Sequence, residues 1–110
     1  MPQVKHIVLL RFKPQTTHEV IAEIFESLDD LQERIPGIVE ICSGPYESPE
    51  GLNKGLTHAF IVTFADVESR DAYLEHAAHE LVKQLIVQHL AGGLADVISF
   101  DFKICDRFRY

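Results

Sequence analysis

The sequence predicts a small α+β domain whose elements follow the order β-α-β-β-α-β. Three observations carry this prediction. The chain has 110 residues, which is the length of one ordinary domain. Two segments repeat apolar residues with helical spacing, and four short segments are rich in the β-branched and aromatic residues typical of strands. No repeat, linker or low-complexity segment divides the chain, so we expect one domain over residues 1–110.

The first strand and the first helix have clear boundary signals. Residues 4–12 are rich in β-branched and aromatic side chains and end at Lys13-Pro14, where the proline breaks the strand. Thr17 is the expected N-cap of a helix over residues 18–35. One apolar stripe runs along this helix, and acidic residues fill its other face. Pro36-Gly37 ends it.

The same kinds of signal place the remaining elements. Strands are expected at residues 38–43, 57–64 and 97–104, and the proline and glycine residues of 44–56 predict a long loop. A second helical region begins at Asp66 and ends before Gly92-Gly93, as one broken helix or two short ones. This order is that of the ferredoxin-like fold, in which both helices cover one face of a four-stranded antiparallel sheet.

Both faces of the central strands carry apolar side chains. In the first strand, Val8 and Leu10 share one face while Ile7 and Leu9 share the other, because successive side chains alternate. Helices on one side leave the second apolar face uncovered. A second copy of the chain is its simplest cover, since sheet-on-sheet packing buries both copies symmetrically. We therefore predict a homodimer that forms a dimeric α/β barrel. The alternative is that these aliphatic side chains remain exposed.

Charge and cysteine content exclude several partners. The chain has 10 Lys and Arg against 17 Asp and Glu, a net charge of -7, so neither nucleic acid nor an anionic membrane is an expected partner. We interpret the basic residues Lys103, Arg107 and Arg109 as a solvated tail. No apolar run is long enough for a signal peptide or a membrane span. Cys42 and Cys105 are expected to be buried, inert thiols in a cytoplasmic protein.

Six histidines among 110 residues are the compositional anomaly. His6 and His58 interrupt apolar strand faces, and His76 and His79 lie one helical turn apart, close to Tyr73. Titratable groups in an apolar pocket are suited to acid–base catalysis, and a tyrosine hydroxyl can donate to or accept from a substrate oxygen. No glycine-rich phosphate loop or Gly-x-Ser-x-Gly elbow is present. The candidate catalytic residues are therefore His6, His58, Tyr73 and His79.

Antiparallel pairing sorts these candidates into two places. The first strand begins where the third one ends, so His6 should lie near Tyr73 and His79. His58 opens the third strand and should lie about 15 to 20 Å away. Two other interpretations stay open. Each histidine can be a hydrogen-bonded core residue. The His-x-x-His pair can ligate zinc, although the sequence offers no evident third ligand.

These segments together resemble the stress-responsive dimeric α/β-barrel (Dabb) family. The resemblance rests on residues 4–12, on 57–58 with 63–64, on 73–79 and on Asp101-Phe102, and it spans about residues 3 to 104. It implies a ferredoxin-like protomer whose sheet packs against that of a second copy to form a barrel. This implication agrees with the two apolar faces of the strands.

The resemblance also implies roles for the candidate residues. Most members of the family have no assigned activity, but a plant member closes a linear polyketide by an aldol condensation without a cofactor. Its functional positions match His6, His58, Tyr73 and His79. In that mechanism Tyr73 and His79 form the acid–base pair and His6 orients the substrate. The chain departs from the family in having Ala77, where a proline is common, and its loop over 44–55 and helix over 81–90 also differ. The resemblance therefore does not carry over a substrate.

Three functional hypotheses remain. The first is a homodimeric stress-associated protein without catalysis. The second is a small-molecule binding protein or cofactor-independent enzyme, with a pocket for a small apolar or aromatic ligand lined by Phe25, Leu28, Phe60 and Val62 and closed by Tyr73 and His79. The third is a metal-dependent enzyme. No cofactor is expected, and no side-chain metal ligands are predicted. Some members of the family that the chain resembles hold magnesium on backbone carbonyls, at positions that correspond to residues near Gln32, Ile35 and Ile38.

Overall fold

Four antiparallel strands form one sheet in the order β2-β3-β1-β4. The computed structural model describes residues 2–110. The central strands pair along their whole length, so that His6 on β1 lies opposite Val62 on β3 and opposite Asp101 on β4. This is the predicted ferredoxin-like arrangement. The strands are β1 (Val4–Leu10), β2 (Ile38–Pro45), β3 (His58–Phe64) and β4 (Val97–Lys103).

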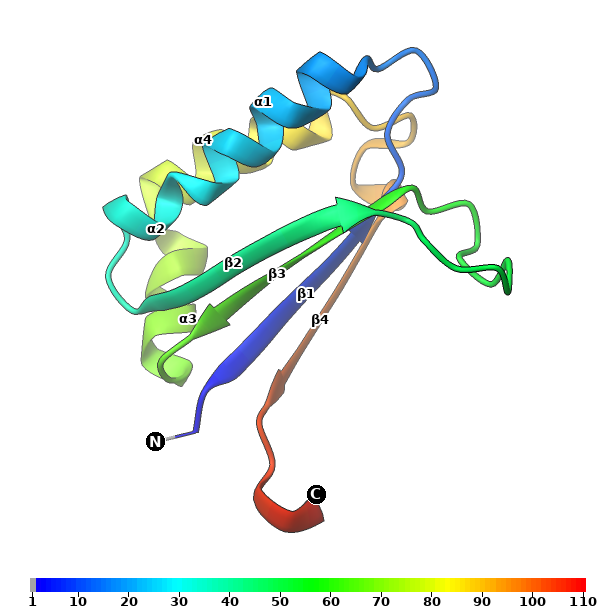
Figure 1. Cartoon of the computed structure of the whole chain (residues 1–110). Coiled ribbons are helices and arrows are strands. Elements are labelled where there is room, and N and C mark those ends of the chain that lie inside the picture. Colours follow the sequence, from blue (N-terminus) through cyan, green and yellow to red (C-terminus); the bar gives the residue numbers. More distant parts are fainter. Residues whose placement is uncertain (1) are drawn as a thin grey trace.

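The helices all lie on one face of this sheet, as the sequence predicts. Figure 1 shows α1 and α4 side by side above the strands and α3 beneath the first turns of α4, while no helix of residues 2–110 covers the opposite face of the sheet. No helix within residues 2–110 is long and apolar enough to cross a membrane. The helices are α1 (His18–Asp29), α2 (Leu31–Arg34), α3 (Val67–Glu75) and α4 (Ala77–Val87), with short 3₁₀ turns η1 (Gly93–Asp96) and η2 (Asp106–Phe108).

Local capping explains where the helices begin. The side chain of Thr17 accepts a hydrogen bond from the backbone N–H of Val20, which confirms the predicted N-cap of α1. Asp66 caps α3 in the same way, with its carboxylate 2.8 Å from the backbone nitrogen of Ser69. The second helical region is two helices, because His76 has extended backbone angles and its ring accepts from the N–H of Ala78. This corner sets the direction of α4.

Several predicted boundaries were wrong by a few residues. The helix expected over 18–35 breaks at Asp30 into α1 and α2. The first strand ends at Leu10 instead of Phe12, since Phe12 makes only an isolated bridge to Leu90. β2 continues to Pro45, because residues 44 and 45 still pair with β3.

The two faces of the sheet have different surroundings. The face toward the helices supplies the core, and its largest fully buried side chains include Tyr73, Phe64 and Leu10. The opposite face is apolar but uncovered in the protomer: the Phe100 side chain, opposite Ile7, is 65% exposed. Ile98 and Phe102 on β4 extend this surface. The structure thus confirms that apolar residues occupy both faces.

The expectation of two buried thiols was wrong. Cys42 is exposed, because it lies opposite Ile61 on the uncovered face of an edge strand. Cys105 is partly exposed, since it follows β4 where the chain leaves the sheet. Both thiols are free. The cytoplasmic location inferred from them stays a prediction.

Candidate functional site

A cavity of about 240 Å³ lies between the helix-facing side of β1 and β4 and the helices α3 and α4. Its lining comes from the strands β1, β3 and β4 on one side and from α1, α3, α4 and η1 on the other. Its wall is largely aliphatic and aromatic. The polar side chains that reach it are His6, Tyr73, His79, Lys83 and Ser99. An apolar pocket with a few polar groups is the usual form of a small-molecule site.

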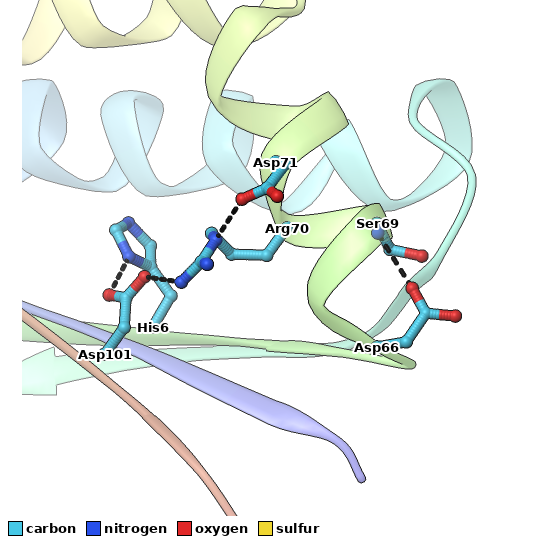
Figure 2. Close-up of polar contacts among 6 residues, drawn as sticks. All are labelled: His6, Asp66, Ser69, Arg70, Asp71 and Asp101. Carbon is cyan, nitrogen blue, oxygen red and sulfur yellow. Dashed lines mark hydrogen bonds and ion pairs between the residues drawn. The ribbon is translucent and has the colours of Figure 1, made fainter. Parts of the chain in front are cut away.

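Asp101 on β4 contacts the ring of His6, and Arg70 on α3 in turn binds Asp101. The His6 Nδ1 lies 2.6 Å from Oδ1 of Asp101 on the neighbouring strand, and Nη1 of Arg70 on α3 donates to Oδ2 of the same carboxylate at 2.8 Å. Figure 2 shows this chain of contacts continuing from Arg70 Nε to Asp71. A carboxylate only accepts hydrogen bonds, so the contact assigns the proton to Nδ1 of His6. Nε2 is then the basic nitrogen, on a ring that lines the cavity.

Tyr73 packs against His6 from α3. The two ring centroids are 5.9 Å apart, and the Tyr73 ring makes an edge contact with Phe64 at 5.0 Å. Burial, and to a smaller extent the negative charge of Asp101, raises the pKa of the Tyr73 hydroxyl. The hydroxyl therefore stays protonated at neutral pH. It is suited to donate a hydrogen bond to an oxygen of a bound molecule.

His79 covers Tyr73 from the first turns of α4. Their ring centroids are 4.2 Å apart, the shortest such distance in this cluster. Burial is the main reason that the pKa of His79 is lowered, and the nearby backbone carbonyl of Leu74 opposes the shift. Its Nδ1 is buried without a hydrogen-bond partner in the described residues. The ring is therefore neutral at pH 7.

The structure brings together His6, Tyr73 and His79 but not His58. The His58 ring packs between Phe12 and Phe25, with centroids at 5.1 Å and 5.9 Å, and its Nδ1 lies 2.9 Å from the hydroxyl of Thr57. Burial, then the charge of His18, lowers its pKa. His58 does not line the cavity that holds the other three. It lines a separate hollow under the β2–β3 loop.

The predicted lining of the pocket was half right. Leu28 and Phe60 line the cavity as expected, but Phe25 and Val62 do not. Phe25 turns toward Phe12 and His58 instead. Val62 is completely buried in the middle of the central strand β3.

Sequence reasoning missed Asp101 and Arg70 as parts of the site. Asp101 had a usable signal, because a carboxylate within an apolar strand lies opposite His6 once the pairing of β1 with β4 is known. Arg70 had none, since its side chain reaches the site from an exposed helical turn. Lys83 and Ser99 were also missed, and both reach the cavity from positions that look like ordinary surface.

No metal centre is evident in this region. Within residues 2–110, no three His, Cys, Asp or Glu side chains come together in a way that could hold a metal ion. Near the backbone-carbonyl positions that the family resemblance suggests, the Gln32 side chain donates to the carbonyl of Val39 at 2.9 Å. The magnesium suggestion stays a prediction.

Comparison with known proteins gives a family match over residues 4–104, to the Stress responsive A/B Barrel Domain. Among curated proteins, olivetolic acid cyclase of Cannabis sativa is 33% identical over 76 residues, covering 69% of this chain and 75% of that protein. A stress-response A/B barrel domain-containing protein of Arabidopsis thaliana is 31% identical over 100 residues, covering 91% and 88%.

Solved structures share the whole fold. A dimeric ferredoxin-like protein of unknown function from Jannaschia sp. CCS1 superposes with a TM-score of 0.84 at 25% identity, covering 93% of this chain and 99% of that one. Hydroxynitrile lyase from Passiflora edulis superposes with a TM-score of 0.85 at 23% identity, covering 97% of both chains. The protein in the first comparison is dimeric. The second comparison, at 23% identity, shows a shared fold alone.

Proposed function

The chain belongs to the stress-responsive A/B barrel domain family, and on that premise we propose that it acts as a homodimer whose protomers each bind a small, largely apolar carbonyl compound and move a proton on it without a cofactor. Membership of this family indicates a domain type and a link to stress, and it does not define a reaction. One observation carries the proposal. A histidine oriented by a carboxylate and a protonated tyrosine line the same apolar cavity, with ring centroids 5.9 Å apart.

The homodimer is supported by the uncovered face of the sheet. Exposed apolar side chains on β4, including Phe100, continue the apolar residues of the central strands. Contiguous apolar surface of this kind is typical of a protein–protein interface. A similar solved structure is dimeric, at 25% identity over nearly its whole length. The site lies on the other side of the sheet, so that dimer formation leaves the cavity open.

Proton abstraction next to a carbonyl needs a base and a stabiliser of the enolate oxygen. His6 supplies the base at Nε2, because Asp101 holds the proton on Nδ1 and stabilises the positive charge that forms on the ring. The Tyr73 hydroxyl supplies the hydrogen bond to the oxygen, since burial keeps it protonated. His79, neutral and in contact with Tyr73, is placed to exchange the proton further.

The resemblance suggested a different division of roles, with Tyr73 and His79 as the acid–base pair. That assignment stays a prediction. The contacts favour His6 as the base, because the Asp101 carboxylate orients its ring through Nδ1, whereas burial lowers the pKa of His79. One relative, 33% identical over 76 residues, bears the name of a cyclase, which is compatible with a reaction and assigns no substrate to this chain.

Exchange of α-protons tests the proposal. Benzylacetone in D₂O would be followed by ¹H NMR with and without the protein, since each proton abstraction replaces hydrogen by deuterium. We expect exchange above the buffer rate, a loss of about 100-fold in His6→Gln and about tenfold in Tyr73→Phe. His58→Gln, outside the cavity, is the matched control and should keep the wild-type rate. A rate equal to that of buffer, or equal rates in all variants, contradicts the proposal.

A further inference from the structure

The charge of the cavity differs from that of the protein as a whole. The chain has a net charge of -7, yet no Asp or Glu lines the cavity and its one lining residue with a fixed charge is Lys83. The carboxylate behind His6 belongs to Asp101, which is not in the lining and is already paired with Arg70. An anion entering the cavity therefore meets a cation and no carboxylate.

Lys83 has the right place on α4 to act on a bound molecule. It follows His79 by four residues, so both side chains lie on the same side of the helix, and both line the cavity. Burial is the main cause of the lowered pKa of His79; the charges of His6 and then of Lys83 lower it further, and that of Glu80 opposes them. Lys83 makes no ion pair among residues 2–110, although Glu80 lies one turn before it on the same helix. Its charge remains available to a ligand.

Exposed leucine side chains at the cavity favour a ligand with an apolar part. Leu74 on α3 and Leu94 on η1 both line the cavity, and they are 45% and 61% exposed. Exposed leucines beside a cavity favour a ligand whose apolar part covers them. Such a ligand has an apolar body and one charged end.

We propose that Lys83 selects amphipathic anions, such as aryl or alkyl carboxylates, as the ligands of this cavity. This inference rests on the proposed function and adds the charge of its substrate class. The carbonyl group lies among the His6 and Tyr73 side chains, and the anionic group lies at Lys83. Lys83 is an exposed residue, so solvent screens the attraction and we expect it to change affinity by about fivefold.

Two fluorescent probes that differ in one anionic group test this. The affinity of anilinonaphthalene sulfonate and of its neutral counterpart N-phenylnaphthylamine would be measured by fluorescence titration. We expect Lys83→Gln to weaken binding of the sulfonate about fivefold and to leave that of the neutral probe within twofold. Lys83→Arg should restore the affinity for the sulfonate, and Lys83→Glu should weaken it further. Lys54→Gln, with the same change of net charge on the β2–β3 loop, should leave both probes unaffected.

The outcomes separate the two claims. If the neutral probe binds and is displaced by benzylacetone but Lys83→Gln changes both probes equally or neither, the selection of anions is wrong and the binding site stands. An equal effect of Lys54→Gln also overturns the inference, because it makes the effect one of net charge. If neither probe binds the wild-type protein, both the inference and the proposed function fail.

Discussion

His6 and Asp101 lie directly opposite one another on β1 and β4, and the 2.6 Å contact between Nδ1 and Oδ1 fixes which nitrogen of the histidine faces the cavity. The register of two strands thus sets the chemistry of the site. Arg70 completes the arrangement by binding the second oxygen of the carboxylate. The pairing predicts consequences for stability as well as for proton transfer.

Asp101→Asn should lower the free energy of unfolding by about 1 to 3 kcal/mol, because it removes a charged acceptor shared by a buried histidine and an arginine. Urea unfolding monitored by circular dichroism measures this. Asp71→Asn is the matched control, since it removes the other carboxylate of Arg70 at a more exposed position and should cost less than about 1 kcal/mol. Equal losses in the two variants would mean that the pair with His6 adds nothing.

Phe100→Lys should convert the proposed dimer into monomers at micromolar concentration, because it puts a charge into the apolar face of the sheet. Sedimentation velocity reports the change directly. Leu81→Lys is the control, since Leu81 on α4 is 66% exposed in the protomer, close to the 65% of Phe100, but lies on the helical side. Dissociation of both variants, or of neither, would contradict the proposed interface.

Stability should fall as the pH drops below about 6.5, the ordinary pKa of histidine. His79 and His58 have lowered pKa values in the folded protein, mainly through burial, so the unfolded chain binds protons before the folded one does. The free energy of unfolding then decreases from pH 7 toward the lowered folded pKa values and becomes independent of these groups below them.

His79→Gln tests the contribution of the cavity to this pH dependence. Urea unfolding at pH 7 and at pH 5.5 should show a smaller loss of stability in His79→Gln than in the wild type, because one of the two responsible groups has been removed. A wild-type protein that gains stability on acidification would show that the sign is wrong.

Gly37→Ala should destabilise the protein by about 1 to 3 kcal/mol. Gly37 has φ of +91°, and an added Cβ would collide with the side chain of Ser69 in the first turn of α3. The substitution therefore strains the turn and displaces the helix that carries Tyr73. Thermal unfolding measures the effect against Gly44→Ala, whose added Cβ has no neighbour within 4 Å and which should unfold within a few degrees of the wild type.

Much of this architecture follows from the sequence pattern. The caps at Thr17 and Asp66, the strand order and the apolar character of both sheet faces all reflect local spacing and alternation, which a single sequence carries. Antiparallel pairing also places His6 beside Tyr73 and leaves His58 at the far end of β3. These relationships depend only on which strand ends meet.

Other features depend on packing that the pattern does not contain. An apolar run at Cys42 predicts burial, but the residue lies on the face that helices leave uncovered. Phe25 faces the core as its spacing requires, yet its ring turns toward Phe12 instead of the cavity. Arg70 reaches Asp101 across the gap between a helix and an edge strand, a contact that no spacing rule encodes.

NMR spectra of the histidine rings, recorded during a titration with benzylacetone, test whether the cavity among His6, Tyr73 and His79 binds the ligand. Signals of the six histidines would be assigned by single His→Gln variants. We expect the Cε1–H resonances of His6 and His79 to shift along one saturable curve while those of His18 and His58 stay in place. A shift of the His58 resonance alone, or no shift at any histidine, would contradict it.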